Sequence, residues 1–291
     1  MIYTIKNELL TVEISSLGAE LQSIKTNDGC EYLYQGNPEF WSGRAPIMFP
    51  ICGRFYSGKY TYLGKEYEMG SHGFARHSEF EMTSFSDNAL TLTLAENEET
   101  KKSYPFNFKF DVTFSLKGNK LFVDYKVTNT DEKTLIFALG GHPAFNVPLS
   151  DGLKFEDYSV EFDTPCDAIK VELSKACFCT YEDKIYTQGG TKTINLTHDL
   201  FDNDAIFLYN VPKKITLSSP LDTRAVTVRF DKMKYVGLWH ATGKAAPYVC
   251  IEPWNSIPSK DGEVDNLLTK REMIHLEKGY VHKTGFSIEI Q

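Results

Sequence analysis

Apolar and polar residues alternate along much of the chain, which is the pattern of a β-strand with one buried face. The longest example is FNFKFDVTFSL, residues 106–116, and its apolar side chains share one face. They are Phe106, Phe108, Phe110, Val112, Phe114 and Leu116. After the turn residues KGNK, the alternation resumes in LFVDYKVTNT at Leu121, Val123, Tyr125 and Val127. The two segments predict a long antiparallel hairpin.

Shorter segments have the same strand composition between Gly, Asn or Asp residues. They are LLTVEIS, GKYTYLGKEYEM, ALTLTLA, AVTVRF and GFSIEI. EVDNLLTKREMIHL has some helical character, but it fits a connector or a strand edge equally well. The sequence contains no long apolar period of 3.6 residues, no linker and no repeat. We therefore expect residues 1–291 to form one all-β domain, as a β-sandwich of large sheets in preference to a closed barrel, although alternation alone is compatible with either.

Composition and charge argue against some classes of binding partner, such as nucleic acids and membranes. With 42% hydrophobic and 24% charged residues, the composition is typical of a soluble globular protein with a sizeable core. A formal net charge of −8 argues against a nucleic-acid partner, which requires a basic face. The apolar stretches fall short of the roughly 20 residues of a membrane helix. The first residues, MIYTIKNELL, lack the pattern of a signal peptide, so we expect a cytoplasmic protein.

The cysteines are spread along the chain, and only Cys177 and Cys179 are close together. The Cys-Phe-Cys spacing differs from the two-residue spacing of zinc sites and redox pairs. We therefore expect free thiols in a reducing compartment. The full set is Cys30, Cys52, Cys166, Cys177, Cys179 and Cys250.

Two segments combine arginine or histidine with glycine and aromatic residues. In PIMFPICGRF, Arg54 follows an apolar run that should be buried, so its charge requires a partner or a ligand unless it lies on the surface at a strand end. In SHGFARHSEF, His72 and Arg76 would share one face if the segment were extended. A polar loop explains the second segment equally well.

Two further segments place a titratable group in unusual surroundings. In GGHPAFNVP, His142 lies between a glycine pair, which permits sharp backbone geometry, and Pro143, which holds the preceding residue extended. It is either a core histidine bonded to a carbonyl group or a functional one. In YVCIEPWNS, Glu252 lies among apolar and aromatic residues, where burial would raise its pKa above about 4.3.

A glutamate and histidines near arginine, with no nucleophile motif, indicate general acid–base catalysis at a polar substrate. A metal site built from His72, His77 and His142 is a weaker interpretation. His72 and His77 are five residues apart, which fits neither one helix face nor one strand face. A serine triad has no Gly-x-Ser-x-Gly elbow to support it.

Together with VEISSLGAELQSI near residue 12, these four segments resemble the aldose 1-epimerase, or galactose mutarotase-like, family. The resemblance covers nearly the whole chain, and HGFAR, GHPAFN and IEPW in this order are jointly specific. It implies a large antiparallel β-sandwich with a substrate cleft across one face. It also implies a small-molecule sugar as the partner and no cofactor, and on the spacing of the histidines we expect no metal ion.

The resemblance also implies roles for individual residues. His142 matches the general acid and Glu252 the general base, while Arg54 and His72 match residues that hold the sugar. In FDNDAIFLYN, Asp204 matches the substrate-binding aspartate. Asp202 lies two residues away and is the alternative. Trp239 and Trp254 either stack on the sugar or pack in the core.

HGFAR differs from the His-Gly-Gly pattern of the best-known galactose mutarotases and looks more like hexose-6-phosphate mutarotases. In that branch, Arg76 together with Arg54 would bind a phosphate, because guanidinium groups match its geometry. Free aldose and sugar 6-phosphate therefore both stay open. Outside the enzymes, the alternative is a non-catalytic sugar-binding or sensing domain. Catalysis is favoured, because a mere binder does not need both His142 and Glu252.

Interconversion of α and β anomers needs a base at the C1 hydroxyl and an acid at the ring oxygen, so that the ring opens to an aldehyde. An ionised Glu252 and a protonated His142 are the required starting pair. A histidine with an unperturbed pKa of about 6.5 is mostly neutral at pH 7. We therefore expect nearby carboxylate charge to raise the pKa of His142.

Overall fold

The two longest alternating segments form the predicted hairpin, made of β9 (Phe108–Lys117) and β10 (Lys120–Asn129). Lys117 pairs with Lys120 across the two-residue turn Gly118-Asn119. Every apolar side chain predicted to share the buried face of this hairpin is buried. The prediction is confirmed in strand type, pairing and orientation.

The hairpin lies inside the larger of two sheets. In the computed structural model, which describes residues 1–187 and 189–291, nine strands form this antiparallel sheet, here called sheet I. In spatial order they are β17 (Thr191–Asn195), β14 (Ser159–Cys166), β19 (Lys214–Ser218), β20 (Val226–Arg229), β25 (Val281–Ile290), β10, β9, β8 (Ala89–Ala95) and β7 (Glu81–Ser86).

The second sheet, here called sheet II, consists of shorter strands. Over the same described residues its order is β16 (Lys184–Ile185), β15 (Ile169–Lys170), β18 (Ile206–Tyr209), β21 (Tyr235–Trp239), β22 (Tyr248–Trp254), β12 (Gly140–Gly141) and β4 (Ile47–Met48), and β13 (Ala144–Asn146) also pairs with β22. All of these pairings are antiparallel.

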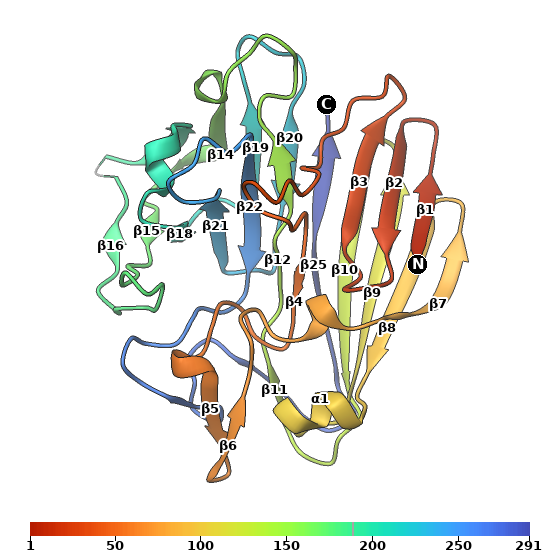
Figure 1. Ribbon diagram of the computed structural model, residues 1–291, viewed down its shortest axis with the longest axis vertical. Coiled ribbons are helices and arrows are strands. Elements are labelled where there is room, and N and C mark those ends of the chain that lie inside the picture. Colours follow the sequence, from red (N-terminus) through yellow and green to blue (C-terminus); the bar gives the residue numbers. More distant parts are fainter. Residues whose placement is uncertain (188) are drawn as a thin grey trace.

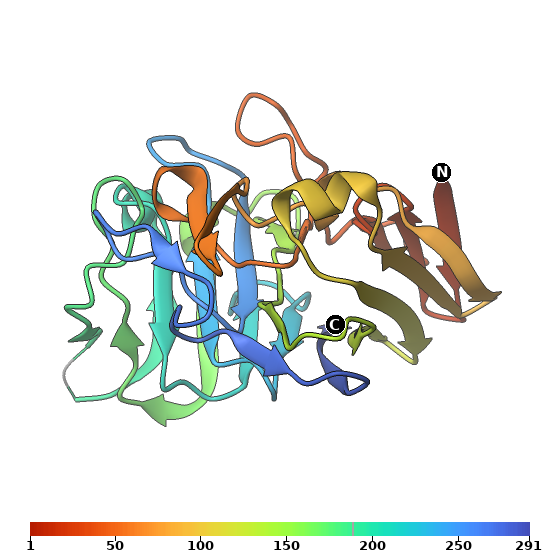
Figure 2. The same cartoon turned by 90° about the horizontal axis from the view of Figure 1, so that it is seen from below.

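Within the part of the chain that the structure describes, three small sheets and a few helical turns complete the fold (Figure 1). The small sheets are β1 (Ile2–Lys6), β2 (Leu10–Ser15) and β3 (Leu21–Thr26); β23 (Asp265–Asn266), β5 (Lys59–Tyr62) and β6 (Lys65–Glu68); and β11 (Leu135–Phe137) with β24 (Ile274–Leu276). The α-helix is α1 (Glu98–Ser103), and the 3₁₀ turns are Tyr56–Gly58, Ala75–His77, Phe155–Asp157 and His198–Phe201. Figure 2 shows α1 against one end of the strands of sheet I.

The two faces of sheet II have different environments because successive side chains of a strand point to opposite sides. Val249 and Ile251 of β22 belong to the hydrophobic core that the inner face of sheet I also lines. The intervening residues Cys250, Glu252 and Trp254 lie outside that core cluster. One face of sheet II therefore closes the sandwich, and the other is available for a site.

The predictions of an all-β fold and of a sandwich are confirmed, and the single domain over residues 1–291 stays a prediction. The protein is all-β, and sheets I and II are open sheets packed as a sandwich and not a closed barrel. EVDNLLTKREMIHL is a connector that contains β23 and β24 and no helix. All six cysteines are free thiols. Within the described residues, no helix has the length and apolar character required to cross a membrane.

Candidate active site

His142 and Glu252 face each other because of the register between their strands. Gly140 pairs with Trp254 and Ala144 pairs with Cys250, so the same register places His142 directly opposite Glu252. Nε2 of His142 lies 3.2 Å from Oε2 of Glu252. The two side chains are only 10% and 3% exposed. The acid–base pair expected from the sequence is thus a buried cross-strand pair.

The glycine pair before His142 serves packing and not a sharp turn, which corrects the sequence-based interpretation. Gly140 and Gly141 form β12, and neither has a positive φ. A Cβ on Gly140 would lie 2.7 Å from Cε of Met48, and one on Gly141 would lie 2.5 Å from Cε1 of Phe286. A side chain at either position would therefore force Met48 or Phe286 to shift, and glycine lets the backbone before His142 pack closely against them.

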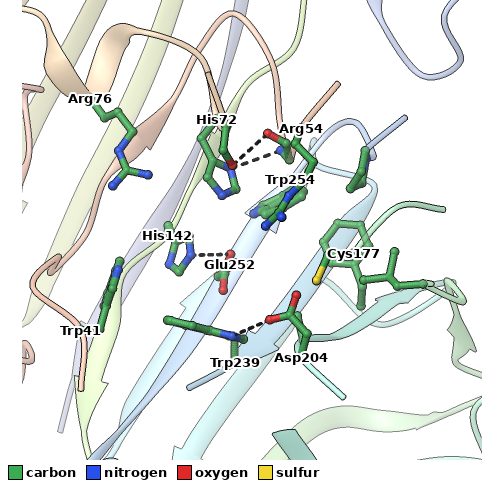
Figure 3. A pocket seen from close by; sticks show the side chains of 16 residues that line it. Trp41, Arg54, His72, Arg76, His142, Cys177, Asp204, Trp239, Glu252 and Trp254 are labelled. Atoms are coloured by element: carbon green, nitrogen blue, oxygen red, sulfur yellow. Dashed lines mark hydrogen bonds and ion pairs between the residues drawn. The ribbon is translucent and has the colours of Figure 1, made fainter. Parts of the chain in front are cut away.

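The pair lies in a cavity of about 310 Å³ on the free face of sheet II (Figure 3). Strands β18, β21 and β22 form the floor, and loops from distant parts of the chain form the walls. The lining residues are Trp41, Gly53, Arg54, Ser71, His72, Arg76, His142, Leu173, Cys177, Asp204, Ala205, Phe207, Trp239, Glu252, Trp254 and Pro258. All six residues predicted to form the site therefore lie in one cavity.

Asp204, and not Asp202, is the aspartate of this cavity. Oδ1 of Asp204 accepts a hydrogen bond of 2.8 Å from the indole N–H of Trp239. Asp202 is exposed and does not line the cavity. The positive φ of 71° at Asp204 is uncommon for a residue with a side chain. Such backbone strain is often found at functional sites.

The SHGFARHSEF segment is a turn, so the extended conformation considered for it is wrong. His72 and Gly73 both have positive φ, and Arg76 lies in the 3₁₀ turn Ala75–His77. A Cβ on Gly73 would lie 2.2 Å from the carbonyl oxygen of Phe49, so this position requires glycine. The turn still brings His72 and Arg76 to the same cavity. His77 lines a different hollow, which argues against the three-histidine metal site.

His72 is held as a neutral hydrogen-bond donor. Its Nδ1 accepts a hydrogen bond of 3.2 Å from the N–H of Gly53, so Nε2 carries the proton. Burial lowers the pKa of His72 well below its usual value, and the nearby His142, Arg76 and Arg54 lower it further. In the view of Figure 3, the two arginines lie on either side of His72.

Burial also controls the protonation of the central pair. It raises the pKa of Glu252 well above its usual value, and the charge of Asp204 adds to this effect. Burial lowers the pKa of His142 to about 3, and the charge of Arg76 contributes. The expectation that a carboxylate would raise the pKa of His142 is therefore wrong, because Glu252 is itself buried and favours its neutral form. The pair holds one proton between its two members over a wide pH range.

Two polar atoms of the pair have no protein partner. Nδ1 of His142 and Oε1 of Glu252 are buried and make no hydrogen bond to the described residues. Buried polar groups are nearly always hydrogen-bonded. Because both side chains line the cavity, a polar ligand there can reach them.

The sequence reasoning missed Trp41, whose ring stacks on that of His142 with 4.9 Å between centroids. The ring of Trp239 meets that of His142 edge to face, with 5.6 Å between centroids. Gly43 makes room for Trp41, because a Cβ there would lie 2.5 Å from its ring. The sequence signal that could have indicated Trp41 is a large aromatic residue within a polar segment that contains glycine. Cys177 of the cavity wall and Phe207 of the cavity floor were also missed, and nothing in their local sequence distinguishes them.

The buried contact between His142 and Glu252 lies at the base of a polar and aromatic cavity of the size of a small-molecule site. Comparison with known proteins specifies the class. The chain belongs to the aldose 1-epimerase family, whose family model, described as aldose 1-epimerase, matches residues 1–266. It is an isomerase of carbohydrate metabolism.

Similar proteins span the same length. Protein LacX (plasmid) of Lactococcus lactis subsp. lactis is 35% identical over 282 residues, which is 94% of each chain. The solved structure of a galactose mutarotase related enzyme from Lactobacillus acidophilus has a TM-score of 0.94 and 36% identity, and the match covers 100% of this chain and 97% of that one. A galactose mutarotase-like protein from Lactobacillus casei ATCC 334 has a TM-score of 0.93 and 33% identity, with 100% of both chains covered.

Proposed function

We propose that this protein interconverts the α and β anomers of an aldohexose by acid–base opening and closure of the sugar ring. The observation that carries the proposal is the buried contact of 3.2 Å between Nε2 of His142 and Oε2 of Glu252 at the cavity floor. In this assignment, Glu252 removes the proton of the C1 hydroxyl and His142 protonates the ring oxygen. The ring opens to an aldehyde, C1–C2 rotates, and the same two groups reverse their steps.

The reacting form of the pair is an ionised Glu252 beside a protonated His142. It contains the same number of protons as the neutral pair favoured by burial. A single proton shift across the 3.2 Å contact therefore produces it, without exchange with solvent. The ring of Trp41 stacked on His142 favours the charged imidazolium through its π face.

The cavity walls supply groups that hold a sugar. We assign Asp204 as an acceptor for a sugar hydroxyl, since Trp239 occupies only its Oδ1. His72 donates from Nε2, and Trp254 offers an aromatic surface beside it. Aromatic faces with convergent polar groups are typical of small-molecule sites.

A polarimetric assay tests the proposal. Freshly dissolved α-anomers of galactose and other aldohexoses should reach equilibrium faster with the protein than without it. Galactose is the first sugar to test because the solved relatives are named after galactose mutarotase. Binding of sugars without any change in rate would instead indicate a sensing domain and would contradict the proposal.

The pH dependence should follow the shared proton. We expect kcat/KM to fall as the pH rises through the raised pKa of Glu252, because the pair then loses its only proton. On the acid side, activity should persist down toward the His142 pKa of about 3, below which the pair gains a second proton. Stopped-flow mutarotation across this range measures the profile. A rate that increases steadily with pH would show that Glu252 acts without a proton on His142.

A sugar 6-phosphate is the second candidate substrate, and a specific observation favours it. Arg54 and Arg76 both line the cavity, and neither guanidinium makes a hydrogen bond or ion pair with the described residues, although Arg76 is half-buried. A half-buried arginine without a protein partner is suited to an anionic ligand. The net charge of −8 does not oppose such a local basic site.

Replacing Arg76 by glutamine separates the two substrates. If the substrate carries a phosphate, we expect kcat/KM for the 6-phosphate to fall by about tenfold to a hundredfold, as for loss of a hydrogen bond to a charged group. The measured quantity is the ratio of kcat/KM for the 6-phosphate to kcat/KM for the free sugar. The influence of Arg76 on the pKa of His142 affects both substrates and cancels in this ratio. Arg229, an exposed arginine of sheet I, provides the control variant Arg229→Gln. An unchanged ratio would assign the enzyme to free sugars.

A further inference from the structure

A third chemically active side chain lies against the acid–base pair. Cys250 is two residues before Glu252 on β22, so both side chains point to the same face of the strand. A ring nitrogen of His142, Sγ of Cys250 and a carboxylate oxygen of Glu252 all lie within 4.8 Å of one another. All three residues are buried, and Cys250 has no part in the proposed anomer chemistry.

We propose that His142, Cys250 and Glu252 bind a borderline-soft divalent cation such as Zn²⁺, and that the bound ion inhibits the enzyme. Imidazole nitrogen, thiolate sulfur and carboxylate oxygen are the donors found in zinc sites. Three protein ligands with an open fourth position form an accessible site, and two of the three ligands here, His142 and Glu252, line the cavity.

The spacing of His142 and Glu252 matches this coordination, and Cys250 lies close by. With metal–nitrogen and metal–oxygen bonds of about 2.0–2.1 Å, a tetrahedral ion separates the two donor atoms by about 3.3 Å. Nε2 of His142 and Oε2 of Glu252 are already 3.2 Å apart. Sγ, with its longer bond of about 2.3 Å, belongs about 3.5 Å from both. It lies within 4.8 Å of a ring nitrogen and a carboxylate oxygen, so coordination requires the Cys250 side chain to move toward the ion.

A second observation supports a ligand at this place. Oε1 of Glu252 is buried without a hydrogen-bond partner among the described residues, so the carboxylate retains unused coordination capacity. On the side of Cys250, the surroundings are apolar or aromatic, with Tyr34, Ala144 and Tyr248 in one buried cluster. Such a shell excludes competing water, but burial also favours the neutral thiol of Cys250, so the ion must displace the thiol proton when it binds.

Occupation of the site would stop the reaction directly. The ion would engage the imidazole nitrogen and the carboxylate oxygen that exchange the proton, so neither could transfer a proton to or from a sugar. The inhibitory effect rests on the proposed mutarotase function, whereas binding of the ion does not. Metal binding and isomerisation are therefore measured separately.

Cobalt(II) is the probe for binding because its spectrum reports its ligands. Addition of Co²⁺ to the chelator-treated protein should give intense visible bands of a four-coordinate ion and a thiolate charge-transfer band in the near ultraviolet. Zn²⁺ should abolish both. Absence of the charge-transfer band in the wild-type protein would overturn the proposal, whatever the outcome of the sugar assay. Absence of mutarotation with an intact band would overturn only the proposed function.

Cys250→Ala is the decisive variant. It should lose the charge-transfer band and require on the order of a hundredfold more Zn²⁺ for half-inhibition, while still isomerising the sugar without Zn²⁺. Cys177→Ala is the matched control for the band, because Cys177 is the thiol that lines the cavity wall. Loss of the band in Cys177→Ala, or its retention in Cys250→Ala, would contradict the assignment. A thermal melt of each variant verifies that it is folded.

Discussion

Replacing Glu252 by glutamine is expected to reduce the rate of anomer interconversion by about 10²–10⁴-fold and to make the protein more stable. The loss of rate follows from removal of the base, since a positioned acid or base typically contributes this factor. The gain in stability follows because Glu252 is almost fully buried, with its pKa raised by burial. Glutamine has nearly the same shape and never ionises.

The gain in stability should depend on pH. Folded Glu252 holds its proton more tightly than the unfolded chain, so between the ordinary pKa of 4.5 and the raised folded value the wild-type protein loses stability as the pH rises. The variant lacks this titration. The difference in melting temperature between variant and wild type should therefore increase with pH above 4.5.

Polarimetry and thermal melts at several pH values measure both effects. Glu161→Gln on β14, outside the cavity, is the control and should change neither. Wild-type activity in Glu252→Gln would remove Glu252 from the chemistry. A variant that is inactive and less stable at every pH would indicate structural damage and not loss of the base.

Replacing His142 by asparagine should also cost about 10²–10⁴-fold in kcat, because the acid is lost. The residual activity should change the sign of its pH dependence. The wild-type rate is expected to fall as the shared proton leaves, whereas a protein without His142 depends only on ionised Glu252. Its residual rate should therefore rise as the pH increases through the raised pKa of Glu252.

This reversal distinguishes loss of the acid from a general disturbance of the cavity. His77→Asn is the matched control, because His77 is exposed and lies outside the cavity. It should retain the wild-type rate and the wild-type pH profile. If His142→Asn keeps a falling profile at a reduced rate, another group supplies the proton to the ring oxygen.

The local pattern of the sequence was sufficient to predict strands but not their partners. The alternation from Phe108 to Leu116 depends only on which face is buried, and it predicted β9 correctly. The meeting of His142 with Glu252 depends on the pairing of β12 and β13 with a strand far along the chain. No local rule predicts such a register, so the residue types suggested an acid–base pair but only the fold shows that the two side chains meet.

The electrostatics of the site were the least predictable part. The carboxylate in CIEPW was recognised as buried, and burial does raise its pKa. The same burial acts on His142, however, and its consequence for the pair was missed because the carboxylate was assumed to be charged. Likewise, Asp202 and Asp204 are two residues apart, so a strand pattern would place both on the same face. Only the fold distinguishes them, because a positive φ and a hydrogen bond from the indole of Trp239 hold Asp204 in the cavity.

The register between β13 and β22 has a consequence for how this enzyme tolerates changes in length. A residue inserted within Tyr248–Trp254 before Glu252 would shift the pairing by one position and turn the carboxylate away from the cavity. Insertions in the loops between β13 and β22 leave that pairing intact. The number of residues between His142 and Glu252 along the chain can therefore change during evolution. The two-residue steps from Gly140 and Ala144 to His142, and from Cys250 and Trp254 to Glu252, cannot change without breaking the register.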